Sequence, residues 1–115
     1  MKFLMTYAGD RSAPPTPEKM AAIGKLTAEM MAAGVVVMTG GLVRPTTGTH
    51  VRMTAGTFSV TDGPFAETKE LIDGFALIEV GSRAEAVEMA RRFMSVAGDG
   101  EGEILQVFEP HNIPH

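Results

Sequence analysis

Three apolar stretches of the chain are predicted to be strands that are covered on both faces. Phe3 to Tyr7 and Phe75 to Val80 carry apolar side chains on both strand faces, and Val35 to Met38 is an uninterrupted apolar run. Such strands are typical of the middle of a layered fold. A sheet covered by helices on one side leaves its other side to water, so the pattern predicts a homodimer in which a second sheet covers that side.

Two segments have helical periodicity. Thr16-Pro17 is typical of a helix start, with Thr16 as N-cap and Pro17 in the first turn, and Gly34 is expected to end this helix after Ala33. Lys19, Lys25 and Glu29 are assigned to its outer face. Its predicted apolar stripe consists of Met20, Ile23, Leu26, Met30 and Ala33.

The second helix is predicted to begin with a capping box at Ser82-Arg83-Ala84-Glu85. In this motif the Ser82 hydroxyl accepts a hydrogen bond from the Glu85 N–H, and the Glu85 carboxylate reaches back to the Ser82 N–H. Gly98 is expected to end the helix in a left-handed conformation. The predicted buried stripe is Val87, Ala90, Phe93, Met94 and Ala97.

Alternation of polar and apolar residues predicts a hairpin between the two halves of the chain. Its strands are expected at His50–Met53 and Thr57–Val60, with Val51, Met53, Phe58 and Val60 on one face. Gly40-Gly41 is interpreted as a bulge or bend before Leu42-Val43, and Ile104–Glu109 as the last strand, after a loop at 98–102. The order β-α-β, hairpin, β-α-β predicts a single ferredoxin-like α+β domain over residues 1–115.

Composition and charge exclude several classes of function. The net charge of -4 and the isoelectric point near 5.3 argue against general binding to nucleic acid, which needs clustered cations. The absence of Cys excludes disulfides, thiolate catalysis and Cys-based metal sites, and no apolar run approaches the ~20 residues of a membrane span. A cytoplasmic protein without cofactor is expected, and His50, His111 and His115 lack the spacing of a metal site.

The strongest functional motif is the stretch Asp62-Gly63-Pro64-Phe65-Ala66-Glu67-Thr68-Lys69-Glu70, between two predicted strands. Gly63 and Pro64 favour a rigid corner, and the Asp62 carboxylate suits the start of that corner. Phe65 is an apolar side chain among charged neighbours, so it is expected to be a buried anchor. A turn followed by a solvated charged loop is the competing interpretation.

This stretch resembles the signature of the YCII-related (DGPF-domain) proteins, with Ser59-Val60-Thr61 before it and Gly74 to Val80 after it. The resemblance extends from Tyr7-Ala8-Gly9-Asp10 to the final strand. It implies a ferredoxin-like subunit that pairs into a dimeric α/β barrel, and it implies no settled activity. Relatives of this kind are thought to use a His-Asp pair, but this chain has no His before His50, so that pair does not carry over.

The expected site is therefore a pocket for a small polar or anionic molecule beside the signature loop. Asp62 or Glu70 would act as a general base and Lys69 would stabilise negative charge, while Tyr7, Arg52 and Phe65 would contribute to binding. Two alternatives stay open. The resemblance also suggests an accessory role beside sigma factors, because relatives occur fused to or encoded next to them, and the loop could instead be a structural latch between two subunits.

Overall fold

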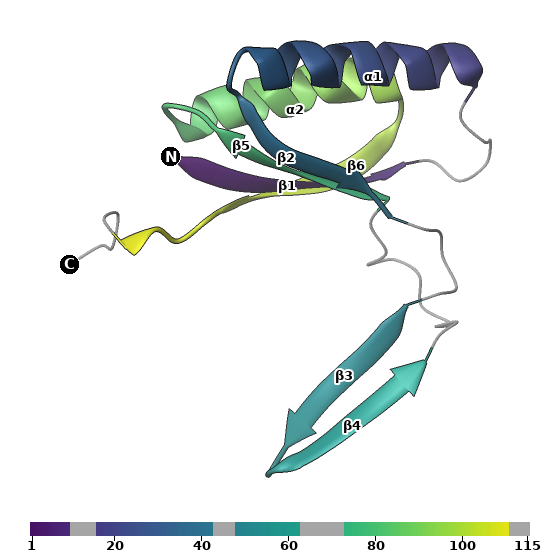
Figure 1. Ribbon diagram of the computed structural model, residues 1–115, viewed down its shortest axis with the longest axis vertical. Coiled ribbons are helices and arrows are strands. Elements are labelled where there is room, and N and C mark those ends of the chain that lie inside the picture. The colour runs from purple at the N-terminus through teal and green to yellow at the C-terminus, as the bar shows by residue number, and fades with distance from the viewer. Residues whose placement is uncertain (10–15, 43–47, 63–72, 111–115) are drawn as a thin grey trace.

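The computed structural model describes residues 1–9, 16–42, 48–62 and 73–110. Two helices and six strands form in this part of the chain, in the order predicted from the sequence (Figure 1). They are β1 (Lys2–Gly9), α1 (Pro17–Ala32), β2 (Val36–Gly41), β3 (Thr49–Thr54), β4 (Thr57–Asp62), β5 (Gly74–Glu79), α2 (Arg83–Ala97) and β6 (Gly100–Gln106).

Four of the strands form one antiparallel sheet in the order β2-β5-β1-β6, and β3 and β4 pair separately as a hairpin. Both helices lie on the same face of the four-stranded sheet (Figure 1). This is an α+β arrangement compatible with the predicted ferredoxin-like fold. The inserted hairpin is confirmed, and we call residues 49–62 the arm.

The core lies between the sheet and α2. Phe3 of β1 is paired directly opposite Ile78 of β5, and both pack with Ala86 of α2 in one buried cluster. The stripe predicted for α2 is wrong at Val87, whose side chain is 51% exposed. Ala86 replaces it because the buried face of α2 starts one residue earlier, where a small side chain lets the helix approach the sheet.

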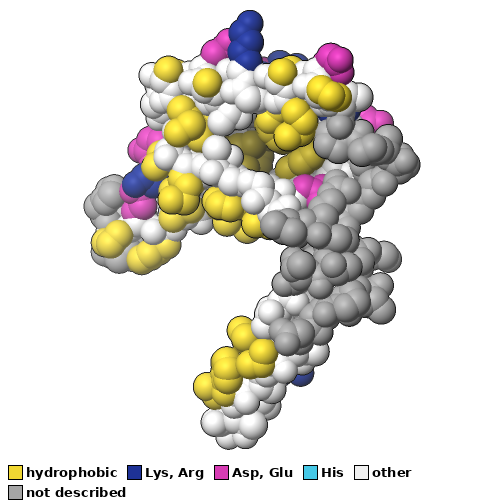
Figure 2. Space-filling view, turned by 45° about the vertical axis from the view of Figure 1, so that its right-hand side comes forward, with side chains coloured by type: hydrophobic (Ala, Val, Ile, Leu, Met, Phe, Trp, Pro, Cys, Tyr) yellow, Lys and Arg dark blue, Asp and Glu magenta, His cyan; other side chains and the backbone are white. Residues whose placement is uncertain are grey.

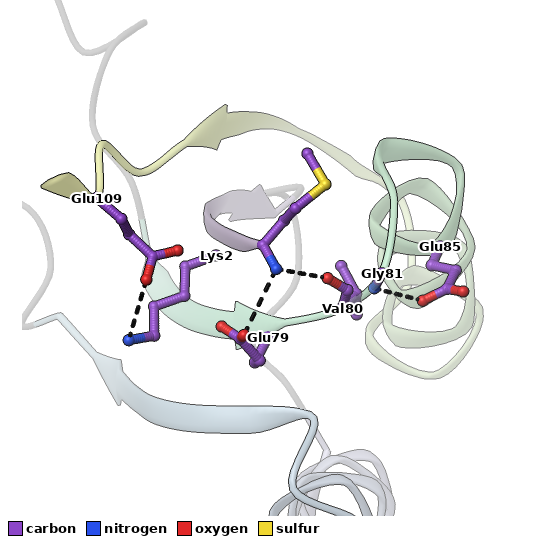
Figure 3. A network of polar contacts seen from close by, with 7 residues as sticks. Lys2, Glu79, Val80, Gly81, Glu85 and Glu109 are labelled. Atoms are coloured by element: carbon purple, nitrogen blue, oxygen red, sulfur yellow. Dashed lines mark hydrogen bonds and ion pairs between the residues drawn. The ribbon is translucent and has the colours of Figure 1, made fainter. Parts of the chain in front are cut away.

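Both helices begin at the predicted N-caps. The Thr16 hydroxyl accepts a hydrogen bond from the Lys19 N–H at 3.1 Å, and the Ser82 hydroxyl accepts one from the Glu85 N–H at 3.2 Å. The second half of the predicted capping box differs, because the Glu85 carboxylate accepts from the Gly81 N–H at 2.7 Å (Figure 3). The Glu85 carboxylate therefore accepts its hydrogen bond from Gly81, the residue before the N-cap, and not from Ser82 as predicted.

A polar network joins the beginning of β1 to the end of β5. The Met1 ammonium donates to the Val80 carbonyl at 2.9 Å and lies 3.4 Å from the Glu79 carboxylate (Figure 3). The Lys2 ammonium lies 3.7 Å from Glu109, which follows β6. These contacts fix the end of the sheet that is opposite the arm.

Two predictions about glycines are corrected. The irregularity in β2 lies between Val36 and Met38, whereas Gly40 pairs regularly with Phe75, and a Cβ at Gly40 would lie 3.0 Å from the Phe75 ring. The predicted loop at 98–102 partly belongs to β6, which begins at Gly100. Gly102 allows this close pairing, since a Cβ there would lie 2.1 Å from the Thr6 carbonyl oxygen.

The sheet face opposite the helices carries a row of apolar residues across all four strands. Leu4 is paired with Leu77 on one side and Leu105 on the other, and Leu77 is paired with Met38. Met38 and Leu105 are among the exposed large apolar residues. The prediction of apolar residues on both sheet faces is therefore confirmed, and the second sheet that would cover this open face stays a prediction.

Candidate functional site

A cavity of about 620 Å³ lies between the helix layer and the four-stranded sheet. Figure 2 shows the hollow there, with hydrophobic side chains in its walls. The walls come from both helices and from every strand of the four-stranded sheet. The helix side chains that form them include Ile23, Leu26, Met30, Met89, Phe93 and Met94.

The cavity walls are adaptable as well as apolar. Five of the nine methionines line it, namely Met5, Met20, Met30, Met89 and Met94. Met is unbranched and polarizable, so it adjusts its shape to different neighbours. The sequence predicted Met20, Met30 and Met94 in the apolar stripes of the two helices, and the structure places these three side chains in the walls of an internal space.

Tyr7 lies at one end of the cavity and is fixed on two sides. Its hydroxyl lies 3.1 Å from the carbonyl oxygens of Gly98 and Asp99, just after α2. Its ring meets the ring of Phe93 edge to face, with centroids 5.2 Å apart. Tyr7 was predicted to contribute to a binding site, and the structure places it in the cavity wall.

Asp73 lies at the same end and was not identified from the sequence. Its carboxylate accepts a hydrogen bond from the Gly9 N–H at 2.7 Å, and its own N–H donates to the Tyr7 carbonyl at 2.6 Å. Its carbonyl accepts from the Leu42 N–H at 2.8 Å. Asp73 thus holds the ends of β1 and β2 together beside the cavity. An acidic residue followed by Gly74 at the start of a strand was the only available signal.

Lys19 supplies a cation to the cavity wall. The sequence assigned it to the outer face of α1, but the side chain is half-buried and lines the cavity. This correction follows from spacing, because Lys19 precedes Ile23 by four residues and Leu26 by seven, which places all three on one helix face. Among the residues that the structure describes, no carboxylate lies within ion-pairing distance of the Lys19 ammonium.

Most of the site predicted from the sequence lies outside the described residues. This applies to Phe65, Lys69 and Glu70, and to the side chain of Asp62, the last residue of β4. Arg52 is exposed on the arm and does not line the cavity, so the structure does not bring it together with Tyr7.

Two further properties concern only the described residues. No three His, Asp or Glu side chains among them are grouped closely enough to hold a metal ion. Neither α1 nor α2 is long and apolar enough to cross a membrane.

Comparisons with known proteins give one similar relative and one matching family. An uncharacterized protein of Rhizobium meliloti (strain 1021) is 40% identical over 76 residues. The match covers 64% of this chain and 61% of that protein, so the chain spans less than two thirds of this relative. The model of the YCII-related domain matches residues 1–110, which is nearly the whole chain. The chain therefore belongs to the YCII-related family.

Proposed function

We propose that the protein binds a small molecule whose apolar body occupies the cavity and whose polar or anionic group lies near Tyr7 and Lys19. The observation that carries this proposal is the cavity itself. Its volume of about 620 Å³ falls within the range of about 300–1,000 Å³ that is usual for small-molecule sites. Apolar walls with a few polar groups at one end are also typical of such sites.

Lys19 supports an anionic group on the ligand. The Lys19 side chain is half-buried in the cavity wall, and a ligand carboxylate or phosphate beside its ammonium would give that cation a charged partner. Lys19 is close to the Tyr7 end of the cavity, because a Cβ at Gly98 would lie 2.9 Å from its ammonium and the Gly98 carbonyl is bound by Tyr7. The two side chains would therefore meet the same end of a ligand.

The signature loop is close in sequence to a residue at this end of the cavity. Asp73 lines the cavity and follows Glu70 by three residues. Acid-base turnover with Asp62 or Glu70 as base, and with Lys69 stabilising negative charge, stays a prediction for that loop. Asp62→Asn and Lys69→Met should each abolish the ligand response if the loop takes part in binding.

The test uses three probes with the same apolar body, namely 4-phenylbutyrate, 4-phenylbutanol and 4-phenylbutylamine. Ligand that binds only the folded state stabilises it by about 2.7 kcal/mol at a hundred times its Kd. We expect the carboxylate to raise the melting temperature most and the amine least. Lys19→Met should remove the preference for the carboxylate while leaving the alcohol response in place.

Ala76→Leu tests whether the response comes from the cavity. Ala76 is half-buried on the helix-facing side of β5, where a larger side chain would enter the cavity. We expect this variant to fold with unchanged or higher stability and to lose the probe response. Ala28→Leu, at an exposed position of α1 outside the cavity, is the matched control. An unchanged response in Ala76→Leu would exclude the cavity as the binding site.

We also propose that the protein acts as a homodimer in which the open faces of two sheets meet. The apolar row Met38, Leu77, Leu4 and Leu105 supports this pairing, since a contiguous apolar surface of this kind marks an interaction site. Light scattering at micromolar concentration should give twice the mass of the chain. A stable folded monomer under these conditions would contradict the pairing.

A further inference from the structure

The arm presents an apolar face that nothing in the described chain covers. Val51 is paired opposite Val60, and Met53 is paired opposite Phe58, so all four side chains lie on one face of the hairpin. Each of them is between 55% and 66% exposed. Single exposed apolar residues are common on protein surfaces, but four in two adjacent cross-strand pairs form a patch.

The arm has the pattern of an element that is covered on one side. Its opposite face carries the polar residues His50, Arg52, Thr57 and Ser59, as expected for a face in water. Its tight turn at Ala55 and Gly56, with φ of 50° and 81°, suits a two-residue hairpin. An isolated two-stranded hairpin is only marginally stable in water, so its apolar face requires a second surface.

The position of the arm indicates which surface covers its apolar face. Figure 1 shows the arm extending below the four-stranded sheet, on the side opposite α1 and α2. Figure 2 shows hydrophobic side chains gathered along one side of the arm. The arm and the open sheet face therefore both border the space on the side of the sheet opposite α1 and α2. The arm extends away from the sheet of its own chain and does not fill that space.

We infer that a second copy of the chain occupies this space and that the arm of each copy covers its apolar face on the sheet layer of the other. One chain carries both apolar surfaces, so a two-fold pairing covers the arm and the open face of both copies at once. This inference rests on the homodimer proposed above and goes further, because it gives the arm a role in the dimer interface. We call this arrangement, in which each arm packs on the sheet layer of the other copy, the clasp.

The first test identifies what covers the arm. Met53 on the apolar face is replaced by the photocross-linking amino acid p-benzoyl-phenylalanine, and Arg52 on the polar face is replaced in a matched control. An equal mixture of isotopically heavy and light protein is irradiated, and the linked peptides are identified by mass spectrometry. We expect position 53, and not position 52, to link heavy to light chains at peptides of the four-stranded sheet.

Three results of this test would overturn the inference. They are a link from position 53 only to its own chain, equal linking from both positions, and no link from position 53. The chain has no Cys, so disulfide-linked dimers cannot imitate the cross-linked product.

The second test measures the strength of pairing. Phe58→Asp places a charge on the covered face, and Arg52→Asp places the same charge on the face in water. Full burial of a Phe side chain corresponds to about a tenfold or larger change in affinity. Sedimentation analysis should show the dimer dissociation constant raised at least about tenfold for Phe58→Asp and little changed for Arg52→Asp.

The outcomes separate this inference from the proposed function. A dimer that keeps its dissociation constant in Phe58→Asp would overturn the clasp while leaving the pairing of sheet faces intact. A monomeric natural protein would overturn both. The thermal response to 4-phenylbutyrate depends on the cavity between the helices and the sheet and not on the arm. Its loss or retention therefore tests only the proposed ligand binding.

Discussion

The ring of Tyr7 stands edge to face against the ring of Phe93, with planes at 84°, and so connects β1 to α2 at the end of the cavity. The same Tyr7 hydroxyl is bonded to the backbone just after that helix. Ring and hydroxyl together fix the position of the α2 C-terminus over the sheet. One side chain thus ties the end of α2 to β1 beside the cavity.

Tyr7→Phe should keep the ring contact and remove the hydrogen bond to the Gly98 and Asp99 carbonyls. Loss of one such bond costs about 1 kcal/mol. Urea unfolding should therefore show a lower midpoint with an unchanged slope. Phe93→Leu is the complementary variant, because it removes the aromatic pair and keeps the hydroxyl. If Tyr7→Phe unfolds like the natural protein, the hydroxyl does not hold the helix end.

Gly102→Ala should be strongly destabilising, by about 2 kcal/mol or more, because the new Cβ would meet the Thr6 carbonyl and push β6 away from β1. Gly24→Ala in α1 is the control. Nothing lies within 4 Å of a Cβ at that position, and Ala favours a helix over Gly by about 1 kcal/mol. Thermal unfolding of the two variants should shift in opposite directions, and equal shifts would contradict the close pairing at Gly102.

Ser82→Ala should cost about 1 kcal/mol, because the N–H of Glu85 loses its acceptor at the start of α2. Ser95→Ala is a matched control within the same helix. The Ser95 hydroxyl donates to the Arg91 carbonyl, which is a bond that helix interiors do not need. Calorimetry should show a lower melting temperature for the first variant only.

Glu88 and Arg91 form an exposed ion pair on α2. The hydrogen bond from the Arg91 guanidinium lowers the pKa of Glu88 below its ordinary value. A carboxyl group with a lowered pKa stabilises the fold above its unfolded pKa, and this contribution is lost as the pH falls through the folded pKa. In an NMR titration, Arg91→Met should raise the Glu88 midpoint. A midpoint that does not move would show that the pair does not persist in solution.

Much of the fold could be predicted because it depends on local periodicity. The alternation from Thr49 to Asp62 has a period of two and predicts a hairpin, and Thr16 and Ser82 are caps whose partners lie three residues away. These features are settled by neighbours in the chain. Gly102 was wrongly assigned to a loop, because its place in β6 depends on a contact that is distant in sequence. That contact is the close approach of its backbone to the Thr6 carbonyl of β1.

The candidate site could be predicted only in part. The sequence named Tyr7 as a binding residue, which stays a prediction, and the structure places Tyr7 in the cavity wall. Lys19 was missed because a charged residue was assigned to the water-facing side of its helix by default. Asp73 was missed because its role comes from the ends of β1 and β2, which meet only in the folded chain. The cavity depends on the spacing between the helix layer and the sheet, and no local pattern reports that spacing.

Gly41 and Gly74 are paired at the end of two antiparallel neighbours, β2 and β5. A turn of two residues would be enough to connect strands at this position, yet the chain inserts residues 42–73 there. The insertion enters and leaves the sheet at one point, so its length can vary without shifting the register of any of the four strands. Evolution can therefore lengthen, shorten or exchange the part of this segment between Leu42 and Asp73 without changing the cavity walls, to which Asp73 itself belongs. The same junction offers a site for grafting an arm from one relative onto another.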